Sequence, residues 1–170
     1  LCGNIATCQQ RISIKDTIAP VIQCPVNTVV NTNPGVCDYT GNIPLPTGTD
    51  NCNQPLIYTC SLLTPTSSVL ITASTPFPKG VNTITCFAKD NCGNQSANCN
   101  FTLTVQDTEK PKITCPQSIS VIGYINAAGN CEANIKNLTP VYSDNCPMPV
   151  LTYNYTGATI GSGSGVINGV

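Results

Sequence analysis

The chain has 170 residues, of which only 9% are charged, and its formal net charge is −1. Nucleic-acid binding and electrostatic attachment to a membrane both need basic surfaces, so this composition argues against either function and against such partners. Hydrophobic residues reach 41%, which argues against disorder, and no apolar run approaches the ~20 residues of a membrane-spanning helix, so no membrane insertion is expected in this segment.

Alternation of apolar and polar residues with a period of two predicts short β-strands throughout. Pro and Gly interrupt every candidate helix. In chain order, the predicted strands of the first 106 residues cover 8–14, 26–30, 38–45, 56–62, 69–73, 83–88 and 99–105. The run Gly-Ser-Gly-Ser-Gly at 161–165 is predicted to be a flexible connection between strands. About seven short strands at this spacing are typical of an immunoglobulin-type β-sandwich, so the predicted fold class is all-β.

An internal repeat organises the chain. The matched segments are 16–20 with 107–111, 22–25 with 113–116, 37–38 with 131–132, 50–52 with 144–146, and 2–4 with 92–94. We therefore predict a closing strand at 1–15 of a repeat begun elsewhere, a complete domain at 16–106, and a second domain at 107–170 that lacks its last strands. Either the chain is an excerpt of a longer array, or a neighbouring copy donates the missing strand.

Twelve cysteines and no histidine define the chemistry that is open to the chain. So many cysteines indicate an oxidising, extracellular setting. No Cys-x-x-Cys pair occurs, which argues against a zinc site, and the lack of histidine removes the commonest general base. Neither a glycosidase-like carboxylate pair nor a phosphate-binding loop is apparent, so we predict that the chain is not an enzyme.

The order of the motifs carries a family resemblance. The succession Asp-Thr-x-x-Pro, Ile-x-Cys-Pro, Gly-Val-Cys, Asp-Asn-Cys, Phe-Pro-Lys-Gly, Cys-Gly-Asn and Cys-x-Phe-Thr-Leu-Thr-Val resembles the hyalin repeat, or HYR domain. It is similar to the cysteine-rich form found in tandem in very large bacterial surface proteins. The resemblance covers nearly the entire chain but departs at 161–169, where glycines and serines replace Phe-Pro-x-Gly.

The resemblance implies tandem immunoglobulin-like β-sandwich domains, rich in disulfides, at a cell surface or in the extracellular space. It also implies a role in adhesion or in surface filaments, and the gliding-motility adhesins of Bacteroidota-like bacteria are one such setting. We therefore expect a structural repeat module that assembles end to end with copies of itself in a linear array. The alternatives are a module that binds surface glycans or proteins through its end loops, and an accessory domain of a secreted enzyme.

The strand order of such a sandwich implies disulfide pairs. The expected pairs are Cys24–Cys99, Cys52–Cys92 and Cys60–Cys86 in the complete repeat, with Cys8–Cys115 and Cys2–Cys146 for the second repeat. Cys37 and Cys131 are left over, and a competing arrangement pairs Cys37 with Cys86. The two leftover cysteines are expected either to bridge between domains or molecules, or to remain buried thiols.

The few carboxylates recur at matching positions of the two repeats. They are Asp16, Asp50 and Asp90 in the first repeat, and Asp107 and Asp144 in the second. If they gather at one end of each domain, their oxygens suit Ca²⁺, which is the one cofactor that the sequence brings into question. The alternative is that Asp and Asn residues only shape tight turns at these positions.

Several positions match sugar-acceptor signals. Asn94, Asn100, Asn137 and Asn154 each begin an Asn-x-Ser/Thr triplet, and Thr17 lies in a short Asp-Thr-Ile motif that resembles a bacterial O-glycosylation signal. We treat these five residues as candidate glycosylation sites.

Overall fold

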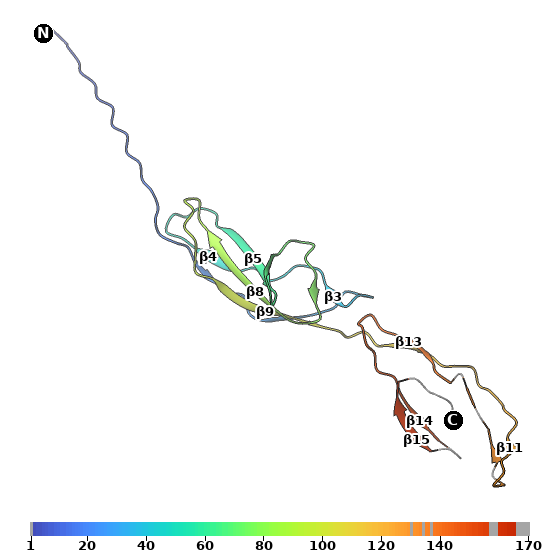
Figure 1. Cartoon of the computed structure of the whole chain (residues 1–170). Coiled ribbons are helices and arrows are strands. Elements are labelled where there is room, and N and C mark those ends of the chain that lie inside the picture. The colour runs from blue at the N-terminus through green and yellow to red at the C-terminus, as the bar shows by residue number, and fades with distance from the viewer. Residues whose placement is uncertain (1, 130, 134, 137, 157–159, 166–170) are drawn as a thin grey trace. The chain divides into compact units, whose positions relative to one another are not determined.

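The computed structural model of the chain describes residues 2–129, 131–133, 135–136, 138–156 and 160–165 (Figure 1). All the regular elements in this part are β-strands. They are β1 Val21–Gln23, β2 Thr28–Asn31, β3 Asp38–Tyr39, β4 Thr47–Thr49, β5 Ile57–Leu63, β6 Ser68–Leu70, β7 Phe77–Pro78, β8 Gly80–Lys89, β9 Cys99–Gln106, β10 Lys112–Thr114, β11 Tyr124–Ile125, β12 Cys131–Glu132, β13 Val141–Ser143, β14 Thr152–Tyr155 and β15 Gly161–Ser164. With three disulfides, the chain is an all-β, disulfide-rich protein, as predicted. Its described residues contain no helix able to cross a membrane.

The largest sheet has five strands in the order β2-β9-β8-β5-β6. Strand β5 runs antiparallel to both of its neighbours, and Cys60 lies directly opposite Cys86 of β8. Strands β2 and β9 correspond to the first and last strands predicted for the repeat at 16–106, and they are neighbours in this sheet. The small β1–β4 ribbon is tied to this layer because a disulfide joins Cys24, which follows β1, to Cys99 at the start of β9.

One face of β8 and β9 forms the core. The buried residues are Asn82, Ile84, Cys86 and Ala88 of β8, and Cys99, Phe101, Leu103 and Val105 of β9. They alternate with less buried neighbours, so the period-two pattern read from the sequence is confirmed in both strands. The one polar member, Asn82, is satisfied because its Nδ2 donates to the carbonyl oxygens of Gly80 and Leu103.

Some predicted strands are shorter or absent. The strand expected at 38–45 is limited to β3, and the next strand, β4, begins only after Pro44 and Pro46, which lack the amide hydrogens that a ladder needs. The strand expected at 8–14 is not formed, and residues 2–15 are exposed throughout. A lone strand has no partner for its backbone groups, so period-two alternation by itself does not make a sheet.

The Gly-Ser run at 161–165 was wrongly predicted to be a loop, since residues 161–164 form β15 against β14. Gly163 lies opposite Tyr153, and a Cβ atom at Gly163 would come within 2.5 Å of the Tyr153 hydroxyl. Glycine is therefore required by the close approach of the ring, which fills the space over the neighbouring strand. Tyr155 lies beside Tyr153, with ring centroids 5.2 Å apart and ring planes tilted by 58°.

The described residues divide into two compact units. The first unit draws on segments 1–30, 40–76 and 80–104, and the second on segments 31–39, 77–79 and 105–170. The second unit therefore combines two short segments of the first sequence repeat, which contain β3 and β7, with the second repeat. Its strands form the ribbons β3–β7, β10–β13, β11–β12 and β14–β15. The tandem immunoglobulin-like domains bounded at residues 106 and 107 remain a prediction from the repeat.

The buried face of β9 makes a direct prediction. Leu103→Ala removes a side chain that is fully buried, so we expect it to lower the free energy of unfolding by about 2–5 kcal/mol. The matched control, Leu45→Ala, truncates an exposed leucine and should change stability by no more than about 0.5 kcal/mol. Urea denaturation of both variants measures the difference, and equal effects would contradict the assigned core.

Candidate functional site: an Asp-Asn-Cys cluster in each repeat

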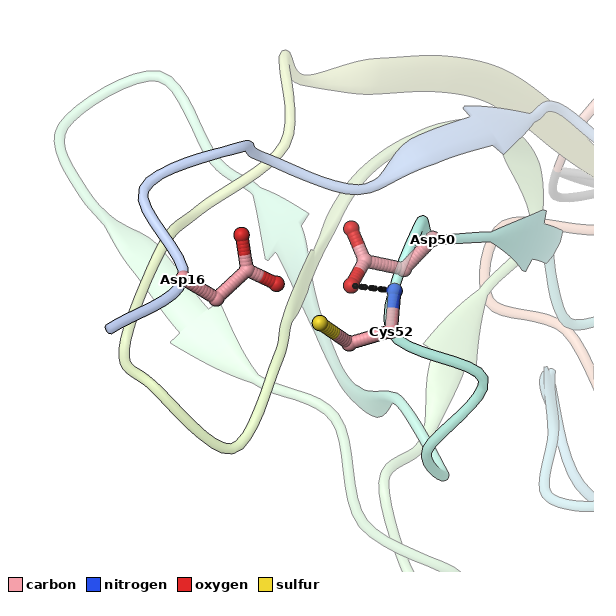
Figure 2. Close-up of side chains that lie close together, drawn as sticks. All are labelled: Asp16, Asp50 and Cys52. Carbon is pink, nitrogen blue, oxygen red and sulfur yellow. Dashed lines mark hydrogen bonds between the residues drawn. The ribbon is translucent and has the colours of Figure 1, made fainter. Parts of the chain in front are cut away.

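In the first unit, three polar side chains converge at the end of the β1–β4 ribbon. Asp16 precedes β1 and Asp50 follows β4, and the pairing of Val21 with Thr49 brings the two ends together. One carboxylate oxygen of each aspartate and the sulfur of Cys52 all lie within 4.8 Å of one another. Figure 2 shows both carboxylates and the thiol directed toward a common space.

Local hydrogen bonds fix this geometry. The backbone N–H of Ile18 and the Nδ2 of Asn51 both donate to Asp16 Oδ1, at 2.9 and 3.3 Å. The N–H of Cys52 donates to Asp50 Oδ2 at 3.2 Å. These are turn contacts of the kind that Asp and Asn side chains favour. The remaining oxygens, Asp16 Oδ2 and Asp50 Oδ1, are buried and have no hydrogen-bond partner within the described chain.

The Cys52 thiol and the Asp16 carboxylate shift each other's pKa. The nearby Asp16 carboxylate, followed by burial and further negative charge, raises the pKa of Cys52 from 9.0 to about 11. The proximity of this thiol, with the hydrogen bond from the Ile18 amide, holds the pKa of Asp16 below its usual value of 3.8. Cys52 is therefore a protonated donor at neutral pH and a weak nucleophile.

Asp90, the third expected calcium ligand of the first repeat, has both oxygens engaged by Asn94. The Asn94 backbone N–H donates to Asp90 Oδ1 at 2.8 Å and its Nδ2 donates to Oδ2 at 2.7 Å. Asn94 Nδ2 also donates a hydrogen bond to the backbone carbonyl oxygen of Asp16 at 3.2 Å. Asp90, Asp50 and Cys52 line a small cavity of ≈ 40 Å³. The third donor facing Asp16 and Asp50 is a thiol, which suits Ca²⁺ poorly, so calcium stays a prediction.

The second unit builds the same cluster from the second repeat. Asp107 Oδ1 accepts hydrogen bonds from the Glu109 N–H at 3.1 Å and from Asn145 Nδ2 at 3.3 Å. These bonds match those that Ile18 and Asn51 make to Asp16 in the first unit. Asp144, the remaining expected ligand, accepts a bond from the Asn145 N–H at 3.0 Å. The repeat seen in the sequence is thus also a repeat of side-chain geometry.

The second cluster is covered by another loop, the one at 35–37. Asn145 Nδ2 donates to the Val36 carbonyl oxygen at 2.9 Å, and a disulfide joins Cys146 to Cys37. The Lys79 ammonium lies 3.3 Å from Asp107 Oδ2. The corresponding oxygen in the first cluster, Asp16 Oδ2, has no partner among the described residues. In addition, Glu109 Oε2 accepts the N–H of Gly35 at 2.9 Å. Cys146 is 3% exposed as a result, whereas Cys52 is exposed.

Burial and hydrogen bonding act in opposite directions on Asp107. Burial alone would raise its pKa, but the contacts from Lys79, Asn145 and the Glu109 amide outweigh that effect and hold the pKa below 3.8. Its side chain is only 6% exposed, so its charge depends on these partners.

The disulfides agree with the predicted pairing in part. Cys24–Cys99 and Cys60–Cys86 are present and are two of the expected pairs. The expected Cys2–Cys146 pair is replaced by Cys37–Cys146. The sequence argument sought the partner of Cys146 in a closing strand, whereas the Asp-Asn-Cys loop meets the Gly-Val-Cys loop of the other repeat. The described cysteines outside these bonds are Cys2, Cys8, Cys52, Cys92, Cys115 and Cys131, all of them exposed.

The candidate sugar acceptors differ in accessibility. Thr17, Asn100 and Asn154 are exposed, whereas Asn94 is half-buried and its amide is engaged by Asp16 and Asp90. Asn137 lies outside the described residues. Modification at Asn94 would require the turn to open.

Comparison with known proteins yields one informative similarity. No family model matches the chain. The chain is 32% identical over 147 residues to Hyalin of Strongylocentrotus purpuratus, an alignment that covers 84% of this chain and 11% of that protein. The similarity supports the hyalin-repeat-like character expected from the motifs. Together with the three disulfides, it is consistent with an extracellular adhesion-type module.

The Asp16–Cys52 contact predicts slow alkylation of Cys52. A pKa of about 11 instead of 9.0 lowers the thiolate fraction at neutral pH about 100-fold. Asp16→Asn removes the negative charge, so we expect iodoacetamide to label Cys52 at least about 10-fold faster. Mass spectrometry gives the rate with Cys8 as the internal reference, and Asp38→Asn is the control. An unchanged Cys52 rate in Asp16→Asn would contradict the contact.

The Lys79–Asp107 pair predicts a pH-dependent loss of stability. Because the folded pKa of Asp107 is depressed, its contribution is present above pH 3.8 and is lost as the pH falls through the lower folded value. Lys79→Met should therefore lower the urea midpoint at pH 7 but have little effect near pH 2. Lys15→Met, in the exposed N-terminal segment, is the control. An equal loss at both pH values would show that Lys79 acts only by packing.

Proposed function

We propose that the chain is a structural repeat module of an extracellular filament or cell-surface adhesin, and that it assembles end to end by strand donation. In this proposal, the segment 2–15 of one copy completes the second repeat of another. The observation that carries the proposal is the exposure of apolar side chains in that segment. Their counterparts in the first repeat form the core.

The N-terminal segment corresponds to β9 in sequence. The spacing that relates Cys8 to Cys99 also relates Ile12 to Leu103, and Ile14 to Val105. Leu103 and Val105 are 0% and 2% exposed, whereas Ile12 and Ile14 are 77% and 93% exposed. Burying each isoleucine would contribute about 1.5–3 kcal/mol. A strand with this pattern and no partner is suited to pairing with another sheet.

The second repeat offers the complementary surface. From residue 107 onward, the buried apolar side chains among the described residues are Cys146 and Leu151. The exposed large apolar residues are Ile113, Ile119, Val121, Ile122, Tyr124, Ile125, Val141, Tyr142, Met148, Val150 and Ile160. An inserted strand would join the ribbons β10–β13, β11–β12 and β14–β15, which are separate sheets in the described part of the chain, as β9 joins β2 and β8 in the first repeat. Cys8 would then reach Cys115, the counterpart of the Cys24–Cys99 bond.

Binding of surface glycans or proteins through end loops is less favoured. An aromatic platform would be its clearest sign, but Tyr153 and Tyr155 pack beside each other over the glycines of β15. No separate observation favours an accessory domain of a secreted enzyme. A surface location and a non-enzymatic role are part of the proposal and are supported by the hyalin-like similarity. A setting in gliding-motility adhesins is also part of the proposal, and it rests only on the motif resemblance in the sequence.

Electron microscopy and light scattering of the purified chain test the proposal. We expect wild-type chains to form linear particles, and chains carrying Ile12→Asp with Ile14→Asp to remain monomeric, because buried carboxylates would oppose insertion. Ser13→Asp is the matched control, since Ser13 alternates with the two isoleucines and should tolerate a charge. Monomeric wild-type chains, or assembly that the double substitution leaves intact, would overturn strand donation.

A further inference from the structure

The second unit contains a complete loop-to-cluster junction, which serves as a template. Its donor half is the Gly35-Val36-Cys37 loop, where Gly35 has a φ of 76°. Its acceptor half is the cluster of Asp107, Asn145 and Cys146. A disulfide and the 2.9 Å hydrogen bond from Asn145 Nδ2 to the Val36 carbonyl hold the halves together. The two halves come from different sequence repeats.

The first unit contains an acceptor half without an occupant. Asp16 and Asn51 are already locked in the geometry of Asp107 and Asn145, each pair joined at 3.3 Å. Cys52, the counterpart of Cys146, is an exposed thiol. Asp16 Oδ2 is buried and has no partner among the described residues, although it stands where Asp107 accepts Lys79. The unsatisfied oxygen and the exposed sulfur both indicate a surface that a loop covers.

The second unit also contains a donor half without an occupant. Cys131 is the counterpart of Cys37 and is an exposed thiol at the start of β12, opposite Ile125. Gly129, two residues before it, has a φ of 82°, close to the 76° of Gly35. Glycine is needed at both positions because other residues rarely adopt this backbone conformation. Gly129 and Cys131 therefore repeat the glycine conformation and the two-residue spacing of Gly35 and Cys37.

We propose that Cys131 of one copy of this chain forms a disulfide with Cys52 of a second copy, with Cys131 and the turn at Gly129 docked on the Asp16–Asn51–Cys52 cluster. This inference rests on the proposed end-to-end assembly and identifies its covalent link. The contact is heterologous, since two different surfaces meet, so one copy uses Cys131 toward one neighbour and Cys52 toward the other.

Pairing of Cys52 with Cys92 within one chain is the competing arrangement. Both residues line the same small cavity in the first unit, yet each remains a thiol. The matching Asp-Asn-Cys cysteine, Cys146, takes its partner from a Gly-x-Cys loop. Cys37 cannot serve Cys52, because it is already bonded to Cys146.

Bond formation requires an electron acceptor. The two thiols lose two protons and two electrons as the Cys131–Cys52 bond forms. A small-molecule disulfide, such as an oxidised tripeptide, accepts the electrons by two steps of thiol–disulfide exchange and leaves as two thiols. Cys52 is not expected to supply the thiolate that starts the exchange, because the neighbouring Asp16 carboxylate raises its pKa to about 11.

Non-reducing peptide mapping of the full chain, assembled in a glutathione redox buffer, tests the inference directly. Digestion at acid pH prevents exchange of disulfides. We expect a fragment in which the Cys52 peptide is joined to the Cys131 peptide. A Cys52–Cys92 fragment in place of it would overturn the inference. If the particles seen by electron microscopy persist in that case, the proposed assembly still stands, so the two failures are distinguishable.

Complementary variants test the direction of the link. Neither Cys52→Ser nor Cys131→Ser should form the Cys52–Cys131 fragment alone, but an equal mixture of the two should form it between copies. The Cys131→Ser chains are labelled with ¹⁵N, so a link between copies joins a heavy Cys52 peptide to a light Cys131 peptide. Only that mixed fragment is taken as evidence for the link. Absence of that fragment in the mixture, when wild-type chains form it, would place the bond within one chain and overturn the intermolecular link.

Discussion

The burial of one face of β9 is the constraint on which the folded part of the chain depends. Strand β9 lies between β2 and β8, and its side chains Phe101, Leu103 and Val105 supply much of the core. The chain has no Trp and few other aromatic residues, so this core is small. Cys24–Cys99 ties the start of β9 to the β1–β4 ribbon, and Cys60–Cys86 joins two neighbouring strands. Such bonds typically contribute about 2–4 kcal/mol each, mainly by restricting the unfolded chain.

Features set by local alternation could be predicted from the sequence. The strands β5, β8 and β9 match their predicted ranges closely, because period-two patterns with one buried face specify both strand and register. The predictions failed where strand formation depended on a contact with another segment rather than on the local alternation of apolar and polar residues. Residues 8–14 alternate as β9 does but pair with no strand among the residues that the structure describes. The Gly-Ser run of β15 forms a strand in which Gly163 lies under Tyr153 and Gly161 under Tyr155, and composition alone does not show those contacts.

The candidate site could likewise be predicted only in part from the sequence. The repeat placed Asp16 near Asp50, and Asp107 near Asn145, because strand pairing fixes those turns. It could not show that Asn94 engages both oxygens of Asp90, since such a choice depends on side-chain rotamers. The partner of Cys146 was also missed. The signal that could have found it was the leftover Cys37 together with the leftover Cys131, which recur at the same place in each repeat.

The Cys37–Cys146 bond also changes how the chain would carry tension. It spans 109 residues, so a pulling force along the backbone would pass from one sulfur to the other and bypass the segment between them. That segment, fully extended, would reach roughly 370 Å at about 3.4 Å per residue. This length is hidden from an applied load while the bond is intact. Reduction of this bond alone would release only part of that length, because Cys24–Cys99 would still keep residues 25–98 out of the load path. The redox states of these two disulfides together therefore set how far the chain can stretch.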